Sequence, residues 1–305
     1  MKTWSFAASR AFSKIVHPMS AVARMSEYFC NHPLTRDAPM RAWERFALWQ
    51  IRSRFQEEIV VPWIEGQRLA VRRGMTGATG NIYVGLHEFS DMLVLLHFLR
   101  QDDVFLDIGA NVGSYTVLAA GVRGARVWAF EPGSETVGAF NRNIELNDLA
   151  GRVVLQQMAL GEHDGVVSFT RGRDTVNRVA TFDDGDVQEV PIRRLDSLIG
   201  ECSPIMIKMD VEGHEEAVIR GARNVLSSDH LKVVEIETLT AQIEATFAEY
   251  GFRRALYNPF TRLLKPFTEE GGKPSAVNAL FVKDWDFVAA RLISGPAVRV
   301  LGRSI

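Results

Sequence analysis

The chain is short of cysteine, of basic charge and of long apolar runs, and each shortage argues against a class of protein. Its two cysteines, Cys30 and Cys202, are far apart in the sequence, which argues against a disulfide framework and favours a reducing, cytoplasmic compartment. The formal net charge of −2 argues against general binding of nucleic acid. No apolar stretch reaches the roughly 18 residues that a membrane-spanning helix needs. We therefore expect a globular protein whose 305 residues form one large domain with an extension.

The N-terminal stretch differs from the rest in its charge. Residues 1–25 contain Lys2, Arg10, Lys14 and Arg24 but no acid, and aromatic and aliphatic residues lie between these bases. One interpretation is a basic amphipathic helix that lies on a membrane surface. The other is a helix that packs on the rest of the protein. The first interpretation predicts a peripheral membrane contact through this stretch.

The section that follows has no single periodicity. Residues 33–58 show a rough helical stripe of aromatic residues, and residues 87–100 show a helical apolar face. Between them, apolar runs at residues 60–63, 68–72 and 81–84 are separated by glycines and predict short strands. We place a boundary there, which divides the chain into an N-terminal extension, residues 1–81, and a catalytic domain, residues 82–305.

The catalytic domain begins with a strand, a glycine loop and a helix. The apolar run 104–108 carries Asp107 near its end, and Gly109, Asn111 and Gly113 follow at alternate positions. Glycines let the backbone approach a ligand closely, and a helix start offers unpaired N–H groups. This order predicts a cofactor site at the loop.

Two further features decide between cofactors. The dinucleotide fingerprint G-x-G-x-x-G needs glycine at three positions that Gly109, Asn111 and Ser114 occupy here, so two glycines are missing. Asp107 would repel a pyrophosphate but would suit a sulfonium with a free amino group. Glu131 ends the next apolar run, where an acid hydrogen-bonds ribose hydroxyls. The sequence therefore favours S-adenosyl-L-methionine over a nicotinamide cofactor.

The rest of the chain alternates strands and helices. We expect strands at 153–158, 204–210, 231–236, 252–257 and 279–282, helices at 134–147, 214–226 and 239–250, and two extra short strands at 165–170 and 187–192. Ser134 is the expected N-cap of its helix. Repeated strand–helix units predict an α/β fold with a mostly parallel sheet that has helices on both faces. Ligands then bind at the carboxyl ends of the strands.

A second motif, Lys208 to Glu215, places five ionisable residues at the end of a central strand. Asp210 directly follows that strand, and Glu237 ends the next one. Transfer of a methyl group to a hydroxyl needs alignment and benefits from a base, and His214 has a suitable pKa. We therefore predict Asp210, His214 and Glu237 as catalytic residues, and His87 and His163 as weaker candidates.

Four ordered motifs carry a family resemblance. The segments 107–116, 130–132, 143–147 and 208–215 together resemble the FkbM family of S-adenosylmethionine-dependent methyltransferases. The resemblance extends over residues 78–283. It implies the class I, Rossmann-like methyltransferase fold with seven strands, and O-methylation of a carbohydrate, glycoconjugate or related natural-product hydroxyl. The family motif varies at the position of His214, which weakens this histidine as an obligatory base.

These considerations define the predicted site. The cofactor-binding residues are Asp107, Gly109, Ala110, Asn111, Gly113, Thr116, Glu131, Pro132, Met158, Ala159 and Asp210. The first residues would hold the methionine end, Glu131 the ribose, and Met158 with Ala159 the adenine. We expect a small-molecule or glycan acceptor, no nucleic acid and no metal. Two alternatives remain open, namely a non-catalytic binding module on a methyltransferase scaffold and a nicotinamide-dependent oxidoreductase.

Overall fold

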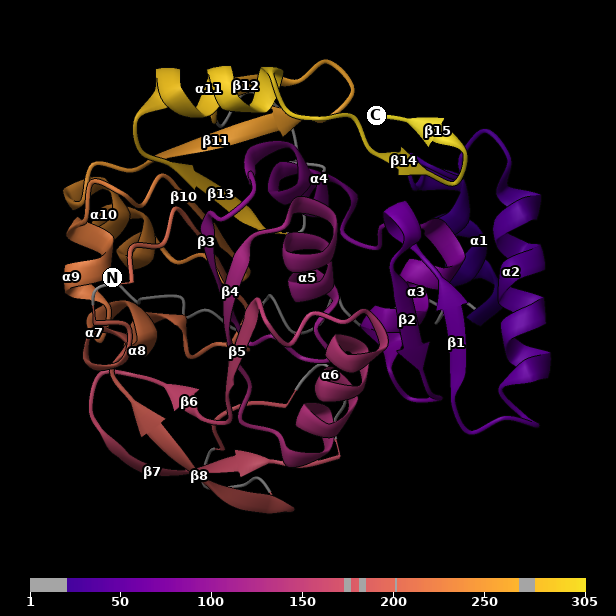
Figure 1. Ribbon diagram of the computed structural model, residues 1–305, viewed down its shortest axis with the longest axis horizontal. Coiled ribbons are helices and arrows are strands. Elements are labelled where there is room, and N and C mark those ends of the chain that lie inside the picture. Colours follow the sequence, from indigo (N-terminus) through magenta and orange to yellow (C-terminus); the bar gives the residue numbers. More distant parts are fainter. Residues whose placement is uncertain (1–20, 173–176, 181–184, 201, 269–277) are drawn as a thin grey trace, which may run out of the picture.

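An eight-stranded sheet forms the centre of the protein (Figure 1). The computed structural model describes residues 21–172, 177–180, 185–200, 202–268 and 278–305. In spatial order the strands are β12 (Leu263–Pro266), β11 (Arg253–Asn258), β13 (Ala279–Val282), β10 (Val233–Ile236), β9 (Met206–Met209), β3 (Val104–Ile108), β4 (Arg126–Phe130) and β5 (Val153–Gln156).

The strand directions agree with the predicted class I methyltransferase architecture. Strands β5, β4, β3, β9 and β10 are parallel, β13 runs antiparallel to β10, and β11 runs antiparallel to β13. The predicted count of seven strands is one too low, because β12 pairs antiparallel with β11 inside a segment expected to be a loop. A four-residue strand at the edge of a sheet leaves only a weak periodic pattern in the sequence.

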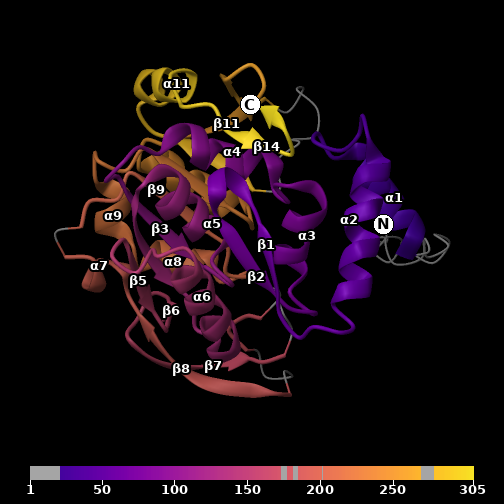
Figure 2. The same ribbon diagram turned by 45° about the vertical axis from the view of Figure 1, so that its right-hand side comes forward.

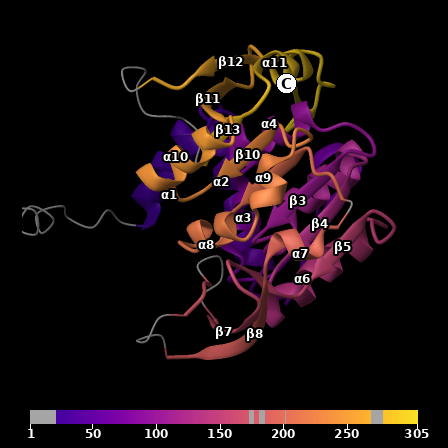
Figure 3. The ribbon, with the colours of Figure 1, turned by 90° about the vertical axis from the view of Figure 1, so that its left-hand side faces the viewer.

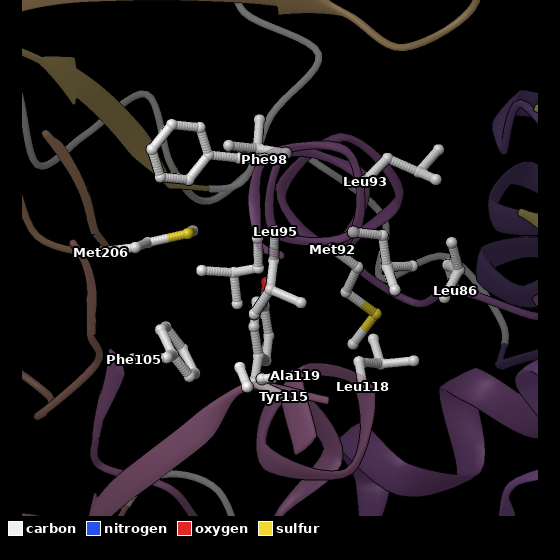
Figure 4. Close-up of a cluster of buried hydrophobic side chains, with 14 of the residues drawn as sticks. Leu86, Met92, Leu93, Leu95, Phe98, Phe105, Tyr115, Leu118, Ala119 and Met206 are labelled. Carbon is white, nitrogen blue, oxygen red and sulfur yellow. The ribbon is translucent and has the colours of Figure 1, made fainter. Parts of the chain in front are cut away.

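Helices cover both faces of the sheet (Figure 3). One face carries α4 (Phe89–Phe98), α5 (Ser114–Val117), the π-helical turn η3 (Leu118–Val122), α6 (Ser134–Leu146) and α11 (Trp285–Ile293). The other carries α7 (Leu195–Leu198), α8 (Glu215–Arg220), α9 (Arg223–Ser227) and α10 (Ala241–Glu249). Figure 4 shows α4 packed through Leu95 and Phe98 above the strand residues Phe105 and Met206.

The N-terminal extension packs beside this core (Figure 2). It contains α1 (Ala21–Asn31), α2 (Pro39–Arg52), α3 (Thr76–Val84), the antiparallel strands β1 (Ile59–Pro62) and β2 (Arg68–Val71), and the short turn η2 (Ile64–Gly66). The Ala70 amide donates to the Asn143 side chain, 2.7 Å away, which joins β2 to α6. The predicted boundary after residue 81 falls inside α3, and the division into 1–81 and 82–305 stays a prediction.

A small second sheet completes the domain. The predicted extra strands are β7 (Gly165–Thr170) and β8 (Val187–Arg193), which pair antiparallel, and β6 (Ala159–Leu160) joins β8. Two short strands that we did not predict, β14 (Arg299–Val300) and β15 (Arg303–Ser304), form a hairpin near the C-terminal end of the chain.

Three local predictions were wrong. Residues 81–84 are the end of α3 and not a strand, because a four-residue apolar run does not distinguish the two. The helix predicted at 214–226 is broken into α8 and α9. At the break, the backbones of Gly221 and Gly161 pass so closely that a Cβ on Gly221 would lie 2.0 Å from the Gly161 carbonyl oxygen. The N-cap of α6 is Gly133, and Ser134 is the first helical residue.

The N-terminal prediction is only partly described. Of the basic stretch 1–25, residues 1–20 lie outside the described residues. Residues 21–25 form the start of α1. No helix within the described ranges has both the length and the apolar character that crossing a bilayer demands.

Candidate active site

A cavity of about 360 Å³ opens at the carboxyl ends of β3, β4, β9 and β10. The structure brings most of the predicted site residues to its wall. These are Asp107, Gly109, Ala110, Asn111, Glu131, Pro132, Met158, Ala159, Asp210, His214 and Glu237. Motifs that are 100 residues apart in the sequence thus surround one space, as expected for the crevice of a parallel sheet.

Gly109, the first glycine of the loop, leaves no room for a side chain. Gly109 has φ +79°, and a Cβ there would lie 1.7 Å from the Asp210 carbonyl oxygen. The amides of Gly109 and Ala110 both donate to the Phe130 carbonyl oxygen, each over 3.0 Å. Asn111 also has a positive φ of 49°, which asparagine tolerates better than most residues. The backbone of this loop is therefore fixed against both neighbouring strands.

Two predicted cofactor residues lie behind the wall. Gly113 has φ +84°, and a Cβ there would meet the Phe140 ring at 2.9 Å, so its role is the close packing of the helix on α6. Thr116 is fully buried, and its hydroxyl donates to the Asp107 carboxylate over 2.6 Å. Both residues position the loop and do not line the cavity.

Asp107 is buried, and burial raises its pKa. The ammonium of Lys208 on the neighbouring strand and the Thr116 hydroxyl oppose this shift. Asp107 and Lys208 are register partners of β3 and β9, which places their side chains on one face of the sheet. An incoming ammonium group would strengthen the charged form of Asp107 further.

Glu131 faces the same cavity from the end of β4. Its two carboxylate oxygens accept hydrogen bonds from the amides of Gly133, over 2.8 Å, and Asn111, over 3.0 Å. Burial raises the pKa of Glu131 to about 7, although these amides favour the charged form. The amides fix the orientation of the carboxylate, which suits it to accept hydrogen bonds from vicinal hydroxyls.

Lys208, Asp210 and Glu237 form a connected group on the opposite side. The Lys208 ammonium donates to Asp210 over 2.7 Å. Burial acts to raise the pKa of Asp210, but Lys208 and a hydrogen bond with Glu237 lower it below the ordinary value. Burial and the Asp210 carboxylate raise the pKa of Glu237 to about 9. At neutral pH, Glu237 is therefore a protonated acid that donates to an ionised Asp210.

The same region gathers carboxylate oxygens. One oxygen each of Asp210, Glu212 and Glu237 lie within 4.8 Å of one another. Hard cations use such oxygens. Here Lys208 supplies the countercharge and Glu237 carries a proton, so the grouping has an explanation without an ion. The absence of a metal stays a prediction.

His214, the N-cap residue of α8, lines the cavity next to this group. Burial lowers the pKa of His214, and the nearby Arg220 lowers it further, so the ring is neutral at neutral pH. Its Nε2 atom is buried beside Gly161 and has no hydrogen-bond partner among the described residues. Of the three predicted catalytic residues, it is the one whose pKa lies closest below neutrality, by the direction of its shift.

The sequence reasoning missed the contribution of the extension. Thr76, Gly77 and Asn81 of α3 line the cavity, and so do His87 and Glu88 just before α4. No motif marks these positions.

His87, a weaker candidate in the sequence, is the best positioned of these residues. Its Nδ1 lies 2.6 Å from the Tyr28 hydroxyl, and its amide donates to the Asn81 side chain over 2.8 Å. A Cβ at Gly80 would lie 2.6 Å from the same ring nitrogen, so the glycine makes room for the ring. The other weaker candidate, His163, has a side chain that is 85% exposed.

Comparison with known proteins identifies methyltransferases as relatives of this chain. Hexuronic acid methyltransferase AglP of Haloferax volcanii is 33% identical over 147 residues, which cover 47% of this chain and 59% of that protein. Methyltransferase 1 of Beauveria bassiana is 29% identical over 161 residues, which cover 44% of this chain and 63% of that protein. The chain therefore spans about three fifths of the length of these relatives.

One solved structure, a putative transferase from Pyrococcus horikoshii, aligns at 17% identity with a TM-score of 0.41, covering 74% of this chain and 72% of that one. Residues 107–254 match the family described as the methyltransferase FkbM domain. The match begins at Asp107 and includes the Lys208 to Glu215 motif. The predicted resemblance to the FkbM methyltransferases is confirmed over these residues.

Proposed function

We propose that the protein is an S-adenosyl-L-methionine-dependent O-methyltransferase that acts on a hydroxyl of a carbohydrate, a glycoconjugate or a related natural product. One observation carries the proposal. A single cavity has the glycine loop and Glu131 on one side, and Asp210, Glu237 and His214 on the other. The cofactor and the acceptor would therefore bind next to each other in one cavity.

The residues present fit the cofactor. The loop at Gly109 allows close backbone approach, because no Cβ fits there. The Asp107 carboxylate suits the amino group, the Glu131 carboxylate suits the ribose, and Met158 with Ala159 forms an apolar border for the adenine. When bound, S-adenosyl-L-methionine supplies a methyl group on positively charged sulfur. A nicotinamide cofactor has no sulfonium with a free amino group, and it would place a pyrophosphate near Asp107.

The acceptor hydroxyl then lies beside Asp210 and Glu237. Glu237 donates to Asp210, and both hold the hydroxyl in line with the methyl group, which provides most of the rate enhancement. We assign His214 as the acceptor of the hydroxyl proton, because the residue lines the cavity and its ring is neutral at neutral pH. Lys208 keeps Asp210 ionised throughout.

The acceptor class rests on the relatives. AglP acts on a hexuronic acid according to its name, and we infer a sugar acceptor for this chain. The wall formed by α3 and the residues just before α4 lies where the extension meets the predicted catalytic domain, and we assign acceptor choice to this wall. The net charge of −2 argues against a nucleic-acid acceptor. The two described cysteines are free, which fits the expected cytoplasmic compartment.

The test is transfer of a radiolabelled methyl group from S-adenosyl-L-methionine to a panel of neutral and uronic-acid oligosaccharides. We expect incorporation with at least one sugar, and its loss in Asp210→Asn without loss of folding. Binding of the cofactor without transfer to any member of the panel or to a set of natural-product alcohols would favour a non-catalytic binding module. A rise in melting temperature with NAD and none with S-adenosylhomocysteine would favour the oxidoreductase.

A further inference from the structure

The outer face of α2 and the turn after it expose a stripe of apolar side chains. The exposed fractions are 68% for Met40, 55% for Leu48, 55% for Ile51 and 84% for Phe55. Their spacing places them on one side of the helix. The opposite side, with Ala42 and Trp49, is buried in the core of the extension. We refer to Met40, Leu48, Ile51 and Phe55 as the α2 stripe.

Bases outnumber acids along the α2 stripe. Arg41, Arg45, Arg52 and Arg54 flank it, and Glu44 is the one acid between positions 40 and 55. In the part of the chain that the structure describes, none of these four arginines forms an ion pair. Glu44 interacts electrostatically with Arg45. The long stems of the arginines can lie along an apolar boundary while their heads stay in polar surroundings.

A second cavity, of about 250 Å³, opens next to the stripe. Arg45, Leu48 and Arg52 of α2 line it together with Trp63 and with Arg299 of β14. The Arg45 Nε donates to the Tyr83 carbonyl oxygen over 2.7 Å, which fixes that guanidinium. The wall combines three cations with apolar surface and no carboxylate, so it fits a phosphate attached to an apolar chain.

The position of α2 leaves the stripe accessible. The helix lies at the edge of the molecule, away from the central sheet (Figure 2). It packs against α1, which the chain enters from residues 1–20, and these residues contain Lys2, Arg10 and Lys14 and no acid. The sequence that precedes α1 is therefore also basic.

We propose that the α2 stripe and its arginines bind the surface of a membrane that contains anionic lipids. An exposed helix whose apolar face is flanked by bases is typical of interfacial helices, and each base near an anionic surface adds attraction. Charge complementarity selects this occupant over a second copy of the chain, whose identical arginines would meet across a symmetric interface. The proposed membrane contact lies on α2, whereas the sequence pattern indicated residues 1–25.

The experiment is flotation of the full-length protein with vesicles of phosphatidylcholine alone, and of phosphatidylcholine with 30% phosphatidylglycerol. We expect binding to the anionic vesicles, weakened by high salt. The variant Leu48→Gln/Ile51→Gln/Phe55→Gln should reduce the partition coefficient at least tenfold. Val166→Gln/Ile293→Gln is the matched control, since these residues are exposed on β7 and α11, and it should float like the wild type.

A variant of the arginines separates charge from apolar contact. Arg41→Gln/Arg52→Gln/Arg54→Gln should abolish the preference for anionic vesicles. Lack of flotation by the wild type, equal flotation of the stripe variant, or loss confined to Lys2→Gln/Arg10→Gln/Lys14→Gln would each overturn the proposal. So would a wild-type dimer in light scattering that the stripe variant converts to a monomer. Flotation and light scattering do not depend on methyl transfer. Binding of S-adenosylhomocysteine is measured separately on every variant, so the proposed function is tested independently.

Discussion

Gly109 and Asp210 are in such close contact that no side chain fits between them. A Cβ on Gly109 would lie 1.7 Å from the Asp210 carbonyl oxygen, and Gly109 has φ +79°. Gly109 starts the loop that we assign to the cofactor, whereas Asp210 belongs to the motif that we assign to the acceptor. Any change at Gly109 therefore displaces both halves of the site together.

Gly109→Ala should unfold the loop or push it away from β9. We expect a loss of about 2 kcal/mol or more in the free energy of unfolding, from the strained φ and the overlap with backbone. Binding of S-adenosylhomocysteine should be lost. Urea unfolding and calorimetry measure the two effects. Gly138→Ala is the control, because α6 leaves open space there, and it should be neutral or stabilising by up to about 1 kcal/mol.

The pKa of Glu131, raised to about 7 by burial, predicts pH-dependent cofactor affinity. The ionised carboxylate accepts hydrogen bonds from ribose hydroxyls, and its population rises from about one tenth at pH 6 to about nine tenths at pH 8. The affinity for S-adenosylhomocysteine should therefore rise roughly tenfold over this range. Glu131→Gln should bind weakly with no such rise. An equal slope in both proteins contradicts the assigned role.

The same pKa has a consequence for stability. The folded pKa of Glu131 lies above the ordinary value, so the folded state holds the proton more tightly than the unfolded state. The free energy of unfolding should therefore fall as pH rises from 4.5 to 7, by an amount that Glu131→Gln removes. Urea unfolding at pH 5 and pH 7.5 measures the difference between the two proteins. A wild type that gains stability relative to the variant over this range contradicts the sign.

Lys208 neutralises the buried Asp107 and the partly buried Asp210, so its removal should be costly. Lys208→Met leaves Asp107 and Asp210 without a countercharge, and we expect a loss of about 3 kcal/mol in unfolding free energy at pH 8. The loss should be smaller at pH 5, because the two carboxyl groups then take up protons. Lys232→Met serves as control, since its partner Asp284 is exposed, and should cost less than about 1 kcal/mol.

The choice of base makes a separate prediction. His214→Gln should lower kcat by about a hundredfold or more. The wild-type rate should fall as pH drops through the His214 pKa, which burial places below 6.5, because the protonated ring cannot accept a proton. This acid limb should be missing in His214→Gln. His163→Gln is the control. A limb that persists in His214→Gln and vanishes in His87→Gln assigns the base to the Tyr28–His87 pair instead.

Much of this architecture was accessible from sequence because strand ends carry acids here. Asp107, Glu131, Asp210 and Glu237 each follow an apolar run, and parallel strands bring such ends together. The fold class and most of the cavity wall followed from that pattern. The mispredicted strand at residues 81–84 shows its limit, since a four-residue run has no period to distinguish helix from strand.

Other features depend on contacts that no local pattern records. His87 becomes part of the site because Tyr28 and Gly80, on different elements, hold its ring. The protonation of Glu237 depends on the distance to Asp210 across two strands. Thr116 was assigned to the cofactor, yet it binds Asp107 from behind, since the helical turn directs its hydroxyl inward. Such roles emerge from tertiary packing alone.

The most direct test of the central claim is calorimetric titration of the full-length protein with S-adenosylhomocysteine, beside Asp107→Asn. Asparagine keeps the shape of the side chain and still accepts the Thr116 hydroxyl, so the variant should fold with an unchanged circular dichroism spectrum. We predict saturable binding by the wild type at a stoichiometry of about one, and loss of that binding in the folded variant. Absence of binding to the wild type, or equal binding by both proteins, would contradict the assignment of this cavity to the cofactor.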